Sequence, residues 1–235
     1  LLGQAANYSA GSGTNFAFTS LNVPIEVQMN YVEQLKPKLL NIAILVDRKN
    51  ISAIETQVKP LEDYARRHGI RVLNVTVQEP QRAREELEKL VADAVVKMRK
   101  NDPSLDHSVF WITGRTAVFR EIATINAHAD RIPVLSVVPE VVTAGDNSAV
   151  LSIGVSCDSN AHLAALYGVT ILLGDMSVGK LKVGVVSPPD IAVNFRKARE
   201  IGLRIPFSFF ESASYIYDYE GKRVRNKGRA VSADD

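Results

Sequence analysis

The chain has 235 residues with a formal net charge of +2, 46% hydrophobic residues and 23% charged residues, the ordinary composition of a globular protein. The near balance of charge gives no indication of nucleic-acid binding, and no apolar run reaches the roughly 18 residues that a membrane span needs. The single cysteine, Cys157, excludes an intrachain disulfide. The chain begins at Leu1 with neither a charged n-region nor an h-region, so we expect further sequence upstream.

Strand and helix patterns alternate along the chain, which predicts parallel α/β layers. Residues 41–46 (NIAILV) are almost all apolar, as expected of a strand covered on both faces. The following helix has a capping-box pattern of Ser52 and Glu55 at its start, and Gly69 ends it. The predicted strands are residues 41–46, 71–77, 108–112, 132–138, 149–155 and 181–186, and the further predicted helices are residues 80–100, 116–128, 158–173 and 194–201.

The first five predicted strands suffice for one complete doubly wound lobe with strand order 2-1-3-4-5. We assign residues 23–155 to this lobe. Residues 1–22 and 156–211 are too few for a second sheet covered on both faces, so they either cover the main lobe or form an incomplete second lobe. Residues 212–235 are a C-terminal tail, in which Tyr215, Tyr217 and Tyr219 alternate as in an edge strand and the part after Gly221 is expected to be disordered.

The chain contains no convincing catalytic or metal-binding pattern. Residues 174–180 fit G-x4-G-K, but Leu181 stands where a P-loop needs Ser or Thr, and the segment follows a helix instead of a strand. No histidine has ligand spacing to another His or Cys. We therefore predict a protein that is not an enzyme and that carries no cofactor and no metal.

Polar residues gather just beyond the ends of the predicted parallel strands. Ligands of open α/β sheets bind at this edge, where neighbouring loops flank one crevice and helix amino ends favour an anionic group. Arg115 follows Gly114 and could hold a carboxylate through its bidentate guanidinium, while Glu140 or Asp158 could bind an amine. The candidate ligand-binding residues are Asn50, Ser52, Thr113, Arg115, Thr116, Ser136, Glu140, Ser156 and Asp158.

The order of these segments resembles a known family, from about residue 15 to residue 206. The segments that carry the resemblance are NFAFTS (15–20), NIAILVD (41–47), RIPVLSVVPE (131–140), SIGVSCDSNAHLAALYGVTILLGD (152–175) and PDIAVNFRKAREIGLRIP (189–206). They are similar, in order and spacing, to the ABC-transporter substrate-binding family whose characterised members include tryptophan- and tyrosine-binding lipoproteins. Ser156 stands where that family commonly has Asp, and Cys157-Asp158 where it commonly has aromatic residues.

The resemblance implies a fold like that of type I periplasmic binding proteins, in which the first third of a family member has no counterpart here. It further implies a periplasmic or membrane-anchored extracytoplasmic protein that binds a small carboxylate-bearing solute, such as an amino acid, between two lobes and delivers it to ABC permease membrane subunits. Two alternatives stay open: a ligand-sensing module of a receptor or regulator with the same fold, and an enzyme of flavodoxin-like or Rossmann architecture.

If the second lobe is incomplete, its long helix loses the partner of its apolar face. We expect that helix, residues 158–173, to present Leu163, Leu166, Val169, Thr170 and Leu173 on one side as unusually exposed apolar surface.

Overall fold

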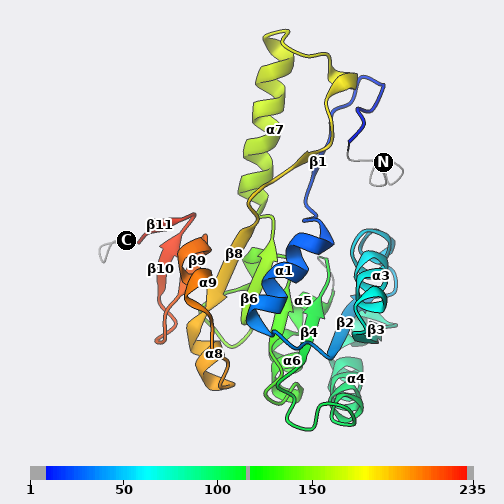
Figure 1. Ribbon diagram of the computed structural model, residues 1–235, viewed down its shortest axis with the longest axis vertical. Coiled ribbons are helices and arrows are strands. Elements are labelled where there is room, and N and C mark those ends of the chain that lie inside the picture. Colours follow the sequence, from blue (N-terminus) through cyan, green and yellow to red (C-terminus); the bar gives the residue numbers. More distant parts are fainter. Residues whose placement is uncertain (1–8, 115–116, 232–235) are drawn as a thin grey trace.

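The computed structural model describes residues 9–114 and 117–231, in which nine strands form one sheet and two more form a small second sheet (Figure 1). The strands are β1 Thr19–Ser20, β2 Asn41–Asp47, β3 Arg71–Val77, β4 Ser108–Ile112, β5 Val134–Ser136, β6 Leu151–Gly154, β7 Gly184–Val185, β8 Asp190–Asn194, β9 Tyr215–Tyr217, β10 Arg223–Asn226 and β11 Arg229–Ala230. The helices are α1 Ile25–Leu35, α2 Ile51–Ala53, η2 Ile54–Val58, α3 Lys59–Arg67, η3 Pro80–Arg82, α4 Ala83–Met98, α5 Ala117–Arg120, α6 Ile122–His128, η4 Pro139–Val141, α7 Cys157–Leu172, η5 Val178–Lys180, α8 Phe195–Glu200 and α9 Phe207–Ser212.

The large sheet has the order β11-β10-β9-β8-β6-β5-β4-β2-β3. Its segment β3-β2-β4-β5-β6 is entirely parallel and reproduces the predicted order 2-1-3-4-5, which is confirmed. The sequence did not predict β8, whose short apolar run follows Pro188 and Pro189 and which pairs antiparallel to β6. The sheet therefore continues past β6 through residues that lie beyond the expected lobe boundary at residue 155.

Alternating side chains of β2 supply two hydrophobic cores, one on each face of the sheet. Ile42 and Ile44 pack with α1 and α3 residues on one face, whereas Ala43 and Leu45 pack with α4 and α6 residues on the other. All seven residues of β2 are buried, so the fully covered strand expected from NIAILV is confirmed.

The helix after β2 begins differently from the expected capping box. Its N-cap is Asn50, whose Oδ1 accepts a hydrogen bond from Ala53 N at 3.1 Å, and the Glu55 carboxylate instead pairs with Lys59 at 2.6 Å. Asparagine caps a helix as well as serine does, so the earlier residue starts the helix. The chain then makes a π-helical turn, η2, directly before Pro60, whose ring and missing N–H do not fit the regular ladder.

The C-terminal residues expected to be disordered after Gly221 form a hairpin instead. β10 pairs antiparallel with β9 and with β11, so β9 is an interior strand of the sheet. The turn before β10 is closed by the Asp218 carboxylate, which accepts hydrogen bonds from Glu220 N and Lys222 N. Backbone pairing and turn chemistry thus order a segment whose polar side chains suggested disorder.

An arm extends from the sheet and consists of residues 9–20 and 157–187 (Figure 1). It contains α7, η5 and the two-stranded parallel sheet of β1 and β7. None of the sixteen residues of α7, all of them described, is buried, and Leu172 and Leu173 are 87% and 71% exposed. Of the five residues expected on the exposed apolar face, Leu166, Val169 and Leu173 are 50%, 53% and 71% exposed, whereas Leu163 and Thr170 are only partly exposed, so the expectation is confirmed for three of them. The arm corresponds to the incomplete second lobe.

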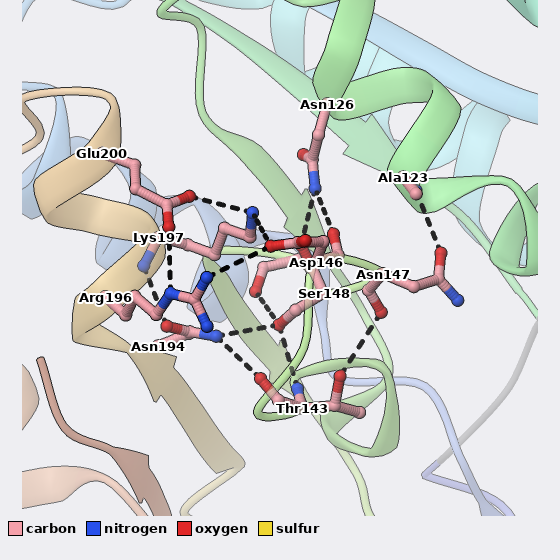
Figure 2. Close-up of polar contacts among 11 residues, drawn as sticks. Ala123, Asn126, Thr143, Asp146, Asn147, Ser148, Asn194, Arg196, Lys197 and Glu200 are labelled. Atoms are coloured by element: carbon pink, nitrogen blue, oxygen red, sulfur yellow. Dashed lines mark hydrogen bonds and ion pairs between the residues drawn. The ribbon is translucent and has the colours of Figure 1, made fainter. Parts of the chain in front are cut away.

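Polar side chains hold the loop of residues 143–148, which leads into β6 (Figure 2). Asn194 donates from Nδ2 to Thr143 O at 2.7 Å, and Asn126 donates to Ser148 O at 2.9 Å. Lys197 pairs with Asp146 at 3.1 Å. The loop is therefore tied to α8 on one side and to α6 on the other, which fixes the start of β6.

Candidate functional site

The candidate site lies at the carboxyl edge of the parallel strands. β2, β4, β5 and β6 run in the same direction, so the segments after them begin at the same edge of the sheet. These segments lead into α2, α5, η4 and α7 respectively. Of the nine predicted residues, Arg115 and Thr116 lie outside the described residues, and the structure places the other seven.

The loops after β2 and β4 are in direct contact. Gly114 has φ 62°, and a Cβ at this position would lie 2.9 Å from Asn50 Nδ2 and 3.0 Å from Ala53 Cβ. A side chain at residue 114 would therefore meet the α2 amino end, and only glycine allows this approach in this backbone conformation. Ser52 lies exposed on the same helix. Asn50, Ser52 and the segment that leads to Arg115 thus belong to one surface.

Thr113 and Ser136 are fully buried and use their hydroxyls to hold the strand ends. Thr113 donates from Oγ1 to Leu45 O at 3.1 Å, and Ser136 Oγ accepts from Val138 N at 3.1 Å. Both positions support the edge from beneath, where they shape the loops that follow.

The amino end of α7 is held by carboxylates. Ser156 caps the helix by accepting from Ser159 N at 3.1 Å, while its own N–H donates to Asp190 Oδ2 at 2.9 Å. Glu140 Oε1 accepts from Cys157 N at 2.8 Å. Carboxylates are favourable at a helix amino end because the free N–H groups there carry partial positive charge. No sequence pattern indicated Asp190, which lies 34 residues from Ser156 and is 9% exposed.

Asp158 points to the C-terminal hairpin. Its Oδ2 lies 2.7 Å from Lys227 Nζ. The carboxylates of this region also act on Tyr215, whose pKa is raised chiefly because burial penalises the phenolate, with Asp190 and Asp158 among the charges that raise it further.

Two buried amide oxygens at this edge have no hydrogen-bond partner within the described part of the chain. They are Oε1 of Gln57, in η2, and Oδ1 of Asn160, in the first turn of α7. Gln57 uses its Nε2 to donate to Asn22 Oδ1 at 2.9 Å, beside the first crossing between arm and sheet. An unpaired buried acceptor is costly, so these oxygens are candidate acceptors for a ligand N–H or ammonium group. Sequence reasoning missed both, because an amide within a helix carries no distinctive spacing.

Over residues 9–114 and 117–231, no cluster of three or more His, Cys, Asp or Glu side chains has the geometry to hold a metal ion. In the same ranges no helix combines the length and the apolar character required to cross a membrane.

Comparison with known proteins identifies the family of the chain. A family model described as ABC transporter substrate binding protein matches residues 7–216. The chain belongs to this family. No curated protein matches it.

Solved structures of other proteins share the fold. A ligand-free, open substrate binding protein with adhesive properties from Clostridium difficile is 20% identical, with a TM-score of 0.64 over 87% of this chain and 63% of that chain. The ABC domain from Streptococcus pneumonia in complex with L-Trp is 18% identical, with a TM-score of 0.60 over 88% and 67% of the two chains. The chain therefore spans about two thirds of the length of these proteins. It has a fold like that of type I periplasmic binding proteins, with one complete lobe and an incomplete second one.

Proposed function

We propose that the chain is the solute-binding component of an ABC importer, acting outside the cytoplasm, and that it binds a small carboxylate-bearing solute such as an amino acid without chemical change. Family membership supports the binding role, and the streptococcal relative in complex with L-Trp supports the class of solute. In this proposal the solute lies between the two lobes, a hinge closes over it, and the permease membrane subunits recognise the closed form.

The observation that carries the proposed site is the convergence of loops at the carboxyl edge. The contact between Asn50 and Gly114 brings two of these loops together, and the bond from Cys157 N to Glu140 joins the η4 segment to the start of α7. We propose that Arg115, together with Thr116 and Ser52, binds the solute carboxylate.

The solute ammonium group needs hydrogen-bond acceptors. We propose that the unpaired amide oxygens of Gln57 and Asn160 supply them, together with Glu140. Asp158 is left out of the proposed solute site because Lys227 already engages its carboxylate.

Calorimetric titration of the full-length protein with a panel of amino acids and organic acids tests this proposal. We expect an amino acid to bind, and Arg115→Ala to weaken that binding by about 1.5–3 kcal/mol, or roughly 10- to 150-fold, because a charged bidentate contact is lost. Arg84→Ala is the matched control, since the Arg84 side chain is 73% exposed on α4 and pairs there with Glu88. Unchanged affinity in Arg115→Ala would remove Arg115 from the site, and failure of every compound to bind would contradict the proposed solute class.

A further inference from the structure

The β10–β11 hairpin lies beyond the residues that the family model matches, which end at residue 216. Its turn consists of Lys227 and Gly228, both with positive φ, at 49° and 76°, between the paired residues Asn226 and Arg229. Two-residue turns with positive φ at both positions match the right-handed twist of a hairpin. The tip is therefore well defined, and it presents a lysine.

This tip reaches the arm. Gly228 N donates to Ser214 O at 2.8 Å, which holds the tip against the segment before β9. Lys227 extends from there to Asp158 in the first turn of α7, and Figure 1 shows the hairpin beside the lower end of this helix. Asp158 also raises the pKa of Lys227, through a hydrogen bond and through its charge, so the lysine stays protonated at neutral pH.

A groove of about 570 Å³ lies between α7 and the tip of the hairpin, and Asp158 and Lys227 belong to its lining. Leu163 and Leu166 of α7 line one side, and Tyr215 and Gly228 line the other. The groove shows that the hairpin tip does not pack tightly along α7. The Lys227–Asp158 ion pair therefore bridges arm and sheet across open space, and a tilt of α7 away from the hairpin would lengthen it.

We propose that the β10–β11 hairpin is a strap that biases the angle between the arm and the sheet, and that the Lys227–Asp158 ion pair is the contact through which it acts. Both side chains are more than half exposed, so the bias is a few-fold at most and is sensitive to salt. Its consequence for the solute site rests on the proposed function: an arm held at one angle shifts the equilibrium between open and closed forms.

Distance measurements between two spin labels test the strap in the absence of any solute. One label replaces Leu172 at the outer end of α7 and the other Val96 on α4, both exposed, in full-length protein carrying Cys157→Ser. In about 20 mM salt we expect Lys227→Glu to shift or broaden the distance distribution relative to the unsubstituted pair. In about 1 M salt, where screening acts within roughly 3 Å, the two distributions should converge.

Exchanging the charges of residues 158 and 227 distinguishes an effect of their ion pair from a general effect of the net charge. Asp158→Lys should reproduce the effect of Lys227→Glu, and the double exchange should restore the original distribution. Lys222→Glu is the matched control, because Lys222 lies at the base of the same hairpin, is 75% exposed and pairs with Glu220. A distribution unchanged in Lys227→Glu at low salt, or equally changed in Lys222→Glu, would overturn the strap. Because no solute is present, neither result depends on the proposed transport function.

Discussion

Replacing Asn194 by alanine tests how the loop before β6 is held. Asn194 is fully buried at the end of β8 and makes two kinds of contact. Its Oδ1 accepts from Lys197 N at 2.9 Å and caps α8, while its Nδ2 donates to Thr143 O at 2.7 Å (Figure 2). The substitution removes the cap and leaves the Thr143 carbonyl without this donor.

The expected loss follows from these two contacts. Losing an asparagine N-cap costs about 0.5–2 kcal/mol. A buried carbonyl left unpaired costs about 1–3 kcal/mol. Ser148, the other acceptor of Asn194 Nδ2 at 3.2 Å, keeps its bonds to Ala149 O and Thr143 N, so it adds little. We therefore expect Asn194→Ala to lower the free energy of unfolding by about 2–4 kcal/mol.

Urea denaturation at pH 7 measures this loss. It is read from the shift of the midpoint, provided that the free energy of unfolding depends equally steeply on urea concentration in both proteins. Asn194→Ser should lose about half as much, because a serine oxygen still caps a helix but is too short to replace the donor to Thr143. Asn101→Ala, at an exposed turn, is the control and should stay within about 0.5 kcal/mol. A loss below about 1 kcal/mol in Asn194→Ala would refute the argument, since it would mean that the buried contacts are replaced at little cost.

Two further substitutions test a close backbone approach and an ion pair. Gly154→Ala should lower the free energy of unfolding by about 2–4 kcal/mol, because the new Cβ would stand 1.8 Å from Val137 O. Gly168→Ala is the control and should not destabilise the protein, because the space around Gly168 is open. Equal urea midpoints for the two variants would contradict the reasoning. The pKa of Glu200 is lowered, chiefly by its hydrogen bond with Lys197. This pair therefore stabilises the fold at pH values above the usual glutamate pKa, and the stabilisation is lost as the pH falls through the lowered pKa of Glu200. Lys197→Met should therefore flatten the fall of the urea midpoint between about pH 5 and pH 3, and an unchanged slope would exclude the pair as a cause.

The fold was largely predictable because its determinants are local. The apolar run at residues 41–46, the glycine stops at Gly69 and Gly174, and the crossover rule together lead to the observed parallel order. β8 was not predicted because its five residues follow two prolines and form a strand through pairing with β6, a partner distant in the sequence. The β10–β11 hairpin was not predicted because backbone pairing orders it, and the hydropathy of its side chains does not indicate such pairing.

The location of the candidate site stays a prediction from the sequence, and the side chains available there could not be predicted from it. Strand ends and loop polarity locate the carboxyl edge, and the glycine at residue 114 does bring two loops together. Which atoms remain available for a ligand depends on partners far away in the sequence. Thr113 turns inward to Leu45 O, and Asp158 is engaged by a lysine 69 residues later, so residue type and spacing could not separate them from Gln57 and Asn160.

Ser156, Cys157 and Asp158, at the crossing that leads from β6 into α7, help to attach the arm. Each is held by a different segment: Ser156 N by Asp190, Cys157 N by Glu140, and the Asp158 side chain by Lys227. The first two contacts are backbone bonds to carboxylates at a helix amino end, and they fix the point at which α7 begins. The third lies to one side of that point and is an exposed ion pair, so it can oppose rotation only weakly. Of these three contacts the Lys227–Asp158 ion pair costs least to break, so in the proposed strap a small change in sequence or salt at the hairpin would alter the arm angle without unfolding the lobe.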